Sequence, residues 1–395
     1  MTILFATTGY VRKGKPTTGL PAYLYRVSQA LLGMGHVPII LTLGLYDFYQ
    51  KDDGIEVYTV YAPRIACKNK CVGFIGDALR ASWSVNKKIK ELSQKRKIDI
   101  IQYTSLMGLP ILYMGSIPAV LRLSSYARIA FSTHISIDKM LVETMAFFER
   151  SSAKRCAAVY APCRVTADKF GKDAHKRVYV LETPFLNDVQ QYDYLFSDKL
   201  KGKKYVLFFG ILSPEKGIGT IAEILYHFLD TYKEYSFVFV GQSYIVNGKN
   251  ASAMLRECAK EYADRIVLFK PLPHEQLYPL IMQAEFVVLP YFNDNLSNAC
   301  LEAMSFAKIV IGTDGGSFEQ VIEHGHNGVL CKRHDSEDLL DKINYVMNLQ
   351  ENEKQKMEFY AKKRIDQLRP EIAVKRLVRF YQRIINQSKK TVFER

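Results

Sequence analysis

Asp294 and Glu302 stand eight positions apart in a segment that reads D-N-L-S-N-A-C-L-E. Between them, Asn295, Ser297 and Asn298 are residue types that cap helices, because their side chains accept hydrogen bonds from unpaired backbone N–H groups. A helix that begins near Ser297 would direct free N–H groups and a partial positive charge at a ligand in front of it. Such a segment could hold a nucleotide sugar, with the diphosphate at the helix tip and one carboxylate at each sugar. The alternative is an ordinary surface loop and a helix with a solvated Glu302.

The residues that follow extend this pattern. After an apolar strand come G-T-D-G-G-S-F-E-Q-V-I and H-N-G-V-L. Together with the first segment, these motifs resemble the signature of retaining glycosyltransferases of family 4, which have the GT-B fold. That signature has two acidic residues, the second followed by Ala-Met, then a strand, a Gly-Gly loop and a downstream Asn-Gly. The resemblance covers roughly the whole chain and is stronger in the second half. Asp294 replaces the family's first Glu, so the charge is kept and its reach is shortened.

The resemblance implies a role for each of these residues. Glu302 would hold the ribose of the donor, and Asp294 would contact the donor sugar. The backbone N–H groups of the helix start, at Leu296, Ser297 and Asn298, would bind the donor phosphates.

A second loop reads G-I-L-S-P-E-K-G and begins at Gly210. It resembles the family's G-R-L-S-x-x-K-G loop, in which the lysine meets the diphosphate. Lys216 would stabilise the negative charge that grows on the leaving diphosphate as the glycosidic bond breaks. With Asp294 and Glu302, it completes the predicted catalytic set. Ile211 replaces the family's arginine, so one of two expected phosphate cations is missing. The alternative is a structural turn with an exposed Lys216.

Further donor contacts are implied outside these two loops. Gly19 is what remains of the family's Gly-Gly turn in the first loop, where the backbone approaches the donor phosphate and the acceptor. One of the basic residues in the stretch 12–15 could supply the missing cation. Gly241 and the pair Pro271 and Leu272 match places where the family holds the nucleotide base.

The resemblance therefore implies a retaining, hexosyltransferase-type glycosyltransferase that uses a nucleotide-diphosphate sugar and needs no metal or other cofactor. A UDP-sugar is the first expectation for the donor and a GDP-sugar the second. The acceptor would be a glycan or a lipid-linked molecule, as in surface polysaccharide or glycoconjugate synthesis. Two alternatives stay open. One is a nucleotide-sugar epimerase on the same fold, and the other is a non-catalytic nucleotide-sugar-binding subunit of a glycan assembly complex.

Two series of strand-like runs alternate with helical runs, which favours α/β domains with parallel sheets and helices on both faces. We expect an acceptor-binding Rossmann-like domain in residues 1–195 and a nucleotide-sugar-binding one in residues 203–370. Two such domains imply a cleft at the carboxyl ends of their strands. Residues 372–385 alternate apolar and basic residues at helical spacing. The GT-B resemblance implies that the C-terminal segment 371–395 crosses back to the first domain.

The net charge of +14 is uneven, because residues 1–200 hold 27 Lys and Arg against 16 Asp and Glu. Much of this excess lies in residues 64–97, interleaved with apolar residues such as Trp83. The pattern is typical of a basic amphipathic helix that can lie on an anionic membrane surface. We expect a cytoplasmic protein that is peripheral on the inner face of the membrane. The alternative is a solvated helix face. Nucleic-acid binding is not expected, since no recognition motif accompanies the charge.

Length and composition set the remaining bounds. A chain of 395 residues with 48% apolar and 24% charged residues indicates a folded protein of two domains. Residues 101–121 carry no charge, but prolines and glycines interrupt them and argue against a membrane span. Seven cysteines without framework spacing indicate reduced thiols. His134 is interpreted as a polar loop residue rather than an acceptor-site group.

Overall fold

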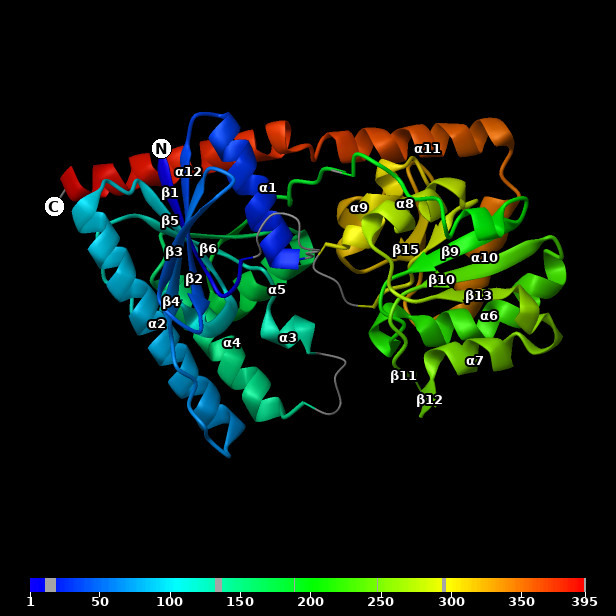
Figure 1. Cartoon of the computed structure of the whole chain (residues 1–395), viewed down its shortest axis with the longest axis horizontal. Coiled ribbons are helices and arrows are strands. Elements are labelled where there is room, and N and C mark those ends of the chain that lie inside the picture. The colour runs from blue at the N-terminus through cyan, green and yellow to red at the C-terminus, as the bar shows by residue number, and fades with distance from the viewer. Residues whose placement is uncertain (11–18, 132–136, 188, 247, 293–295, 394–395) are drawn as a thin grey trace. The chain divides into compact units, whose positions relative to one another are not determined.

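The computed structural model describes residues 1–10, 19–131, 137–187, 189–246, 248–292 and 296–393 (Figure 1). The chain divides into two units, each with its own sheet. Unit 1 comprises Met1–Leu186 and Leu368–Arg395, and unit 2 comprises Asn187–Gln367. None of the helices in the described ranges is both long and apolar enough to cross a membrane.

Unit 1 is built on an eight-stranded sheet. Its strands are β1 (Thr2–Thr7), β2 (Val37–Gly44), β3 (Phe48–Asp52), β4 (Ile55–Tyr61), β5 (Ile100–Thr104), β6 (Ala119–Arg122), β7 (Ala158–Ala161) and β8 (Val178–Val180). They lie in the order β3-β4-β2-β1-β5-β6-β7-β8. The pairs are parallel, except that β3 runs antiparallel to β4 at one edge. The sequence did not predict β3, because its residues are mostly exposed and lack an apolar alternation.

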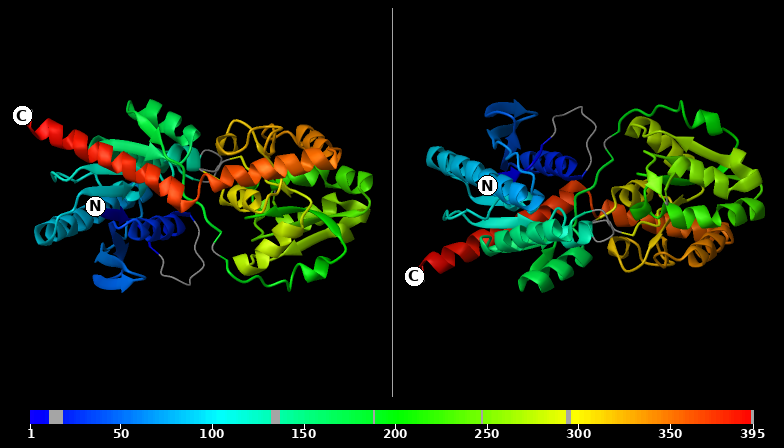
Figure 2. Two further views of the ribbon diagram at one scale, coloured as in Figure 1. Left: turned by 90° about the horizontal axis from the view of Figure 1, so that it is seen from above. Right: turned by 90° about the horizontal axis from the view of Figure 1, so that it is seen from below.

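Helices cover both faces of this sheet. They are α1 (Gly19–Gly33), α2 (Lys70–Lys95), α3 (Ala127–Ala130), α4 (Lys139–Lys154), α5 (Arg164–Ala174) and α12 (Pro370–Phe393). On one face, α1 and α12 bury residues such as Val27 and Leu377 against Ile3 and Phe5 of β1. On the other face, α2, α4 and α5 pack over the same strands. Figures 1 and 2 show α12 lying along unit 1, which confirms the predicted return of the C-terminal helix to the first domain.

A buried row of tyrosines fastens α12 to the sheet. The Tyr381 hydroxyl of α12 donates to Gln102 Oε1 of β5, and the Tyr160 hydroxyl of β7 donates to the same oxygen at 2.5 Å. Tyr23 of α1 continues the row, with its hydroxyl 2.8 Å from that of Tyr160. Burial raises the pKa of Tyr160 and Tyr381 well above the usual tyrosine value, so both hydroxyls stay protonated donors.

Unit 2 contains a six-stranded parallel sheet. Its strands are β9 (Lys204–Phe209), β10 (Tyr235–Val240), β13 (Ile266–Phe269), β14 (Val287–Val288), β15 (Val310–Thr313) and β16 (Val329–Cys331). They lie in the order β13-β10-β9-β14-β15-β16, which is the nucleotide-binding doubly wound order. The order reverses between β9 and β14, and ligands of such sheets bind outside the carboxyl ends of the strands at that point.

The α-helices in the described part of unit 2 are α6 (Ile218–Thr231), α7 (Ala251–Cys258), α8 (His274–Gln283), α9 (Asn298–Ser305), α10 (Ser336–Met347) and α11 (Glu351–Asp366). The first four lie between strands, and α10 and α11 follow the last strand, β16. A small antiparallel hairpin of β11 (Ile245–Val246) and β12 (Lys249–Asn250) was not predicted from the sequence. Its strands are too short to show an apolar alternation.

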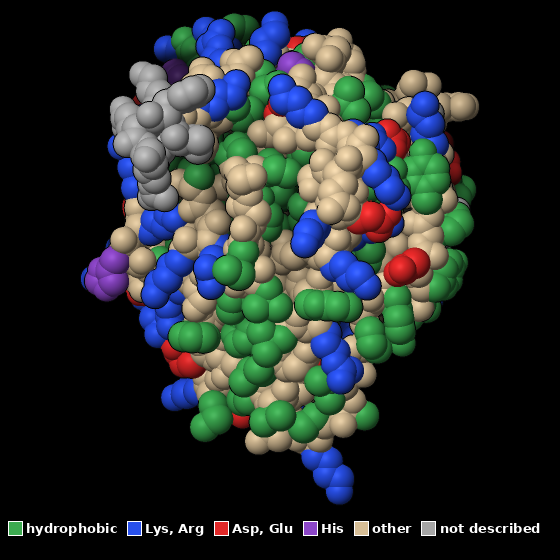
Figure 3. Space-filling model, turned by 90° about the vertical axis from the view of Figure 1, so that its left-hand side faces the viewer, with side chains coloured by type: hydrophobic (Ala, Val, Ile, Leu, Met, Phe, Trp, Pro, Cys, Tyr) green, Lys and Arg blue, Asp and Glu red, His purple; other side chains and the backbone are tan. Residues whose placement is uncertain are grey.

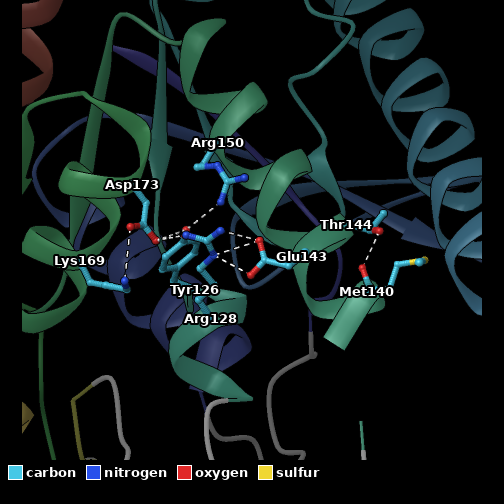
Figure 4. A network of polar contacts seen from close by, with 8 residues as sticks. All are labelled: Tyr126, Arg128, Met140, Glu143, Thr144, Arg150, Lys169 and Asp173. Atoms are coloured by element: carbon cyan, nitrogen blue, oxygen red, sulfur yellow. Dashed lines mark hydrogen bonds and ion pairs between the residues drawn. The ribbon is translucent and has the colours of Figure 1, made fainter. Parts of the chain in front are cut away.

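A network of polar contacts fixes the segment that follows β6 (Figure 4). The Arg128 guanidinium bonds to Glu143 of α4 at 2.5 Å and to Asp173 of α5 at 2.9 Å. The Tyr126 hydroxyl donates to Asp173 at 2.8 Å and accepts from Arg150 at 3.2 Å. The ion pairs hold α3 between α4 and α5 on one side of the sheet.

Glu149 of α4 is buried beside this network, and its Oε2 accepts the Ala127 amide at 3.0 Å. Burial raises the pKa of this carboxyl to about 8, from 4.5 in an unfolded chain. The folded state therefore holds the proton more tightly, and the stability from this group is lost as the pH rises from about 4.5 to 8. We expect Glu149→Gln to raise the free energy of unfolding, relative to wild type, more at pH 8.5 than at pH 5.

Urea denaturation at both pH values tests this expectation. Glu143→Gln on the same helix is the control, because hydrogen bonds from Arg128 lower the pKa of Glu143. Stability from Glu143 is present above its unfolded pKa of 4.5 and is lost only as the pH falls below that value, so Glu143→Gln should lower the free energy of unfolding by nearly the same amount at pH 5 and at pH 8.5. A Glu149→Gln effect of equal size at both pH values would contradict the raised pKa of Glu149 in the folded protein.

Candidate functional site

Two backbone loops meet at the carboxyl ends of β9 and β10 in unit 2. The Gly210 amide donates to Val240 O at 2.9 Å, and the Gly241 amide donates to Phe269 O at 3.0 Å. A Cβ atom on Gly241 would lie 1.8 Å from Gly210 O, and one on Gly210 would lie 2.5 Å from the Tyr291 hydroxyl oxygen. The predicted residues Gly210 and Gly241 are therefore in direct backbone contact, and neither position has room for a side chain.

Lys216 ends a short 3-10 helix, Pro214–Lys216, just after this contact. Its Nζ lies 3.9 Å from the centroid of the Tyr291 ring. The Tyr291 hydroxyl in turn donates to Phe209 O at 2.7 Å, and Thr313 Oγ1 donates to Tyr291 O at 2.5 Å. Tyr291 thus links the ends of β9, β14 and β15 and holds the Lys216 ammonium at the point where the strand order reverses. The sequence analysis missed Tyr291, whose only local signal is its place in the loop that follows the strand β14.

The helix α9 begins where the capping residues predicted it. Ser297 is the N-cap, and its Oγ accepts the Cys300 amide at 3.3 Å. Ser297 is buried, whereas Leu296 and Asn298 are partly exposed. The first N–H groups of a helix have no partner within the helix, so the α9 start provides donors for an anion.

Glu302 lies one turn inside α9 and is only 8% exposed. Its Oε1 is 3.5 Å from His274 Nε2, at the first position of α8. The His274 ring stacks on Tyr278, with centroids 4.9 Å apart and planes at 9°. Pro271 and Leu272 belong to the loop that leads directly into α8. The structure therefore brings the predicted base-binding loop and the predicted ribose carboxylate to the same place, and it adds His274, which the sequence analysis missed.

The residues of unit 2 that were predicted to bind the donor lie within a segment that matches a known family. The model of the family described as glycosyl transferases group 1 matches residues 195–364. Unit 2 carries a glycosyl transferases group 1 domain. The predicted resemblance to glycosyltransferases is confirmed at this level, while membership of family 4 stays a prediction.

Curated relatives of this domain also have glycosyltransferase names. An uncharacterized glycosyltransferase of Methanocaldococcus jannaschii is 25% identical over 145 residues, which are 37% of this chain and 38% of that protein. GDP-mannose:cellobiosyl-diphosphopolyprenol alpha-mannosyltransferase of Xanthomonas campestris is 27% identical over 185 residues, 47% of each chain. The chain thus spans less than half the length of these relatives.

Solved structures match along nearly the whole chain. Sucrose-phosphate synthase from Thermosynechococcus elongatus has a TM-score of 0.73 at 14% identity and covers 97% of this chain and 99% of its own. Anabaena HepE in complex with UDP has a TM-score of 0.68 at 16% identity, with 97% and 100% covered. At these identities the likeness shows the fold alone, and it confirms the predicted GT-B fold.

Some predicted site residues fall outside the glycosyl transferases group 1 domain or outside the described residues. Gly19 begins α1 in unit 1, with a positive φ of 65° that favours glycine. Asp294, His134 and the basic residues in 12–15 lie outside the described residues. Ile211 is 46% exposed in the domain and places an apolar side chain where the family has its arginine.

Gly217 directly follows Lys216 and fixes the loop that carries it. Its φ is 69°, and a Cβ at this position would lie 2.1 Å from the carbonyl oxygen of Pro290. We expect Gly217→Ala to lower the free energy of unfolding of the glycosyl transferases group 1 domain by roughly 2–4 kcal/mol, because it combines a left-handed backbone with overpacking against rigid backbone.

Gly219 in the adjacent α6 is the matched control, since a Cβ there would meet no atom within 4 Å. Gly219→Ala should leave stability unchanged or raise it by up to about 1 kcal/mol. Denaturant unfolding of both variants measures the difference. Equal stabilities of the two variants would show that the loop moves freely around Gly217.

Proposed function

We propose that this protein is a retaining, hexosyltransferase-type glycosyltransferase that transfers a sugar from a nucleotide-diphosphate sugar to a glycan or lipid-linked acceptor. The observation that carries the proposal is that Lys216 and the helix α9, with its Glu302, follow the carboxyl ends of the adjacent strands β9 and β14 in one glycosyl transferases group 1 domain. A UDP-sugar is the first choice of donor, supported by the UDP complex of the structural neighbour HepE. A GDP-sugar is the second, supported by the name of the Xanthomonas relative.

In the proposed reaction, the bond between the sugar C1 and the diphosphate oxygen breaks, and a bond between C1 and the acceptor oxygen forms on the same face. The acceptor proton passes to an oxygen of the departing nucleoside diphosphate. Lys216 and the N–H groups of α9 would stabilise the charge on that diphosphate, without a metal ion. Asp294 would orient the donor sugar and Glu302 the ribose. The contribution of the protein is then mainly positioning and electrostatics.

An anionic group on the acceptor is supported by a buried cation in unit 1. Arg122 at the carboxyl end of β6 is 5% exposed. Its guanidinium donates to Ser124 Oγ at 3.0 Å and to Thr183 Oγ1 at 3.3 Å, and lies 3.7 Å from the centroid of the Tyr23 ring. Among the described residues, no carboxylate forms an ion pair with Arg122. A buried charge without a counter-ion is costly, so a phosphate or carboxylate of the acceptor would be stabilised there.

A membrane-bound acceptor also agrees with the charge of unit 1. Residues 64–97 include α2, whose lysines would favour a peripheral position on the anionic inner face of a membrane. This location suits the synthesis of a surface polysaccharide or glycoconjugate on a lipid carrier.

Release of nucleoside diphosphate from a panel of UDP-, GDP- and ADP-sugars tests the proposal, with Glu302→Ala beside the wild type. Slow release from one donor by the wild type, lost in the variant, is the expected result. Tight binding of a nucleotide sugar without release of nucleoside diphosphate, even with glycan and lipid acceptors present, would contradict an enzymatic function. It would indicate a non-catalytic nucleotide-sugar-binding subunit instead. A rearranged sugar formed without any acceptor would indicate an epimerase.

A further inference from the structure

One side of α2 carries large apolar side chains that unit 1 leaves uncovered. Val72, Ile75, Leu79 and Trp83 are 55%, 37%, 39% and 59% exposed. Their three- and four-residue spacing places them along one stripe of the helix. A different stripe is buried in the core of unit 1 and consists of Cys71, Ala78, Ala81, Val85, Ile89 and Leu92. A merely solvated helix face would be polar, so the exposed stripe needs another explanation.

The exposed stripe, which contains Trp83, continues toward the C-terminus of α2, where it borders a cavity of about 610 Å³. Asn86, Lys90 and Ser93 follow Trp83 at the same spacing and line one wall of the cavity. Residues 112–117, from the connection between β5 and β6, line the other wall. The volume lies within the roughly 300–1,000 Å³ of small-molecule sites.

The second wall is fixed to α2 by hydrogen bonds. Ser82 Oγ and Asn86 Nδ2 donate to Leu109 O at 2.8 and 3.0 Å. The Leu112 amide donates to Ser82 Oγ at 3.1 Å, which places Leu112 beside the turn of α2 that carries Trp83. The Tyr113 hydroxyl donates to Ile117 O at 2.7 Å and closes the loop on itself. The cavity is therefore a formed feature of unit 1, continuous with the apolar stripe.

The lining of the cavity is amphipathic and carries positive charge. Ile89, Leu112 and Ile117 contribute apolar surface, and Lys90 and Lys97 contribute ammonium groups. No Asp or Glu is among the described residues that line it. Lys97 has an acid nearby, Asp99 Oδ1 at 3.5 Å, but its side chain remains 85% exposed.

The other lysines of this helix have different surroundings. Lys88 and Lys95 both bond to Glu91, at 2.9 and 2.7 Å, on another side of α2. Lys87 lies over the ring of Trp83, 4.9 Å from its centroid. The side of the molecule on which α2 lies shows hydrophobic side chains gathered together with Lys and Arg around them (Figure 3).

We propose that the cavity binds the headgroup of an anionic phospholipid while the apolar stripe of α2 enters the surface of the same bilayer. Lys90 and Lys97 would bind the lipid phosphate, and Leu112 and Met114, 42% and 87% exposed, would extend the apolar contact beyond the helix. An apolar patch bordered by lysines matches a surface that is anionic outside and apolar within. The inference deepens the proposed membrane association, on which it rests, and is independent of sugar transfer.

Trp83 provides a direct test, because it is the only tryptophan in the chain. The full-length protein is titrated with vesicles of phosphatidylcholine, and with vesicles of phosphatidylcholine and phosphatidylglycerol in equal parts. With the anionic vesicles we expect the Trp83 emission to shift to shorter wavelength and to become protected from acrylamide quenching. Lys90→Gln with Lys97→Gln should weaken binding about thirty-fold, since each lysine near an anionic surface contributes about 1 kcal/mol.

Lys88→Gln with Lys95→Gln is the matched control, because it removes the same charge from the side of α2 that is paired with Glu91. We expect it to weaken binding several-fold less than the cavity pair does. Equal losses in the two double variants would overturn the cavity as the lipid site and leave only diffuse attraction. If the protein sediments with vesicles but the Trp83 emission does not change, the apolar stripe does not enter the bilayer. If the protein does not sediment with vesicles at all, the proposed membrane association is wrong. Nucleoside diphosphate release, measured separately, reports on the transfer reaction in every case.

Discussion

Lys216→Met is expected to lower kcat for sugar transfer roughly 10²- to 10³-fold, the effect of removing one donor that stabilises developing charge. The loop G-I-L-S-P-E-K-G holds Lys216 as its one cation, because Ile211 occupies the arginine position of the resembled family. Tyr291 holds the ammonium at the carboxyl edge of the sheet, 3.9 Å above its ring. Methionine keeps the length of the side chain and its contact with the ring, so the loss reports mainly on the charge.

The split between kcat and KM decides what Lys216 does. Charge on the diphosphate grows as the glycosidic bond breaks, so kcat should fall far more than KM rises. Lys204→Met is the matched control, since Lys204 also lies over a tyrosine ring, 5.7 Å from the centroid of Tyr235, but at the start of β9. It should leave both constants nearly unchanged. A rise in KM with kcat unaltered would show that Lys216 binds the donor equally well in the ground state and the transition state and does not accelerate the reaction.

The parts of the fold that the sequence predicted are those with a local signal. Buried parallel strands such as β9 and β10 are continuous apolar runs, and Ser297 marks the start of α9 because capping is a local hydrogen bond. The edge strand β3 has neither signal, since exposed positions do not constrain side-chain type.

Partners far apart in the sequence could not be predicted. Tyr291 meets Lys216 and His274 meets Glu302 only because the sheet brings separate loops to one edge. The stripes of α2 show a second limit. The sequence indicated a basic amphipathic helix, but both stripes contain apolar residues at helical spacing. Packing against the sheet is what distinguishes the buried Val85 from the exposed Trp83.

Glu302→Gln is expected to raise the donor KM roughly 10- to 100-fold, because a hydrogen bond to a charged group contributes about 1.5–3 kcal/mol. The Glu302 side chain is largely buried, and His274 Nε2 lies 3.5 Å from its Oε1. Glutamine keeps the shape and removes the charge, and it replaces one acceptor oxygen by a donor. A ribose diol that donates two hydrogen bonds to the carboxylate would lose at least one of them. The chemistry at the sugar lies away from Glu302, so kcat should fall less than kcat/KM.

Calorimetric titration with modified nucleotides shows whether the lost contact is to the ribose. Wild type should bind the 2′,3′-dideoxy form of the preferred nucleoside diphosphate much more weakly than the natural form, because the carboxylate then loses both donors. Glu302→Gln should discriminate far less between the two nucleotides, since removing either partner of one hydrogen bond removes the same interaction. Glu234→Gln is a suitable control, because Glu234 accepts a hydrogen bond from Lys204 at 3.0 Å at the amino end of the same sheet. Equal discrimination by wild type and Glu302→Gln would place the ribose elsewhere. In that case, the weaker nucleotide binding of Glu302→Gln would come from the loss of the negative charge beside His274. If the contact between His274 and Glu302 orients the loop before α8, His274→Gln should weaken nucleotide binding in the same way.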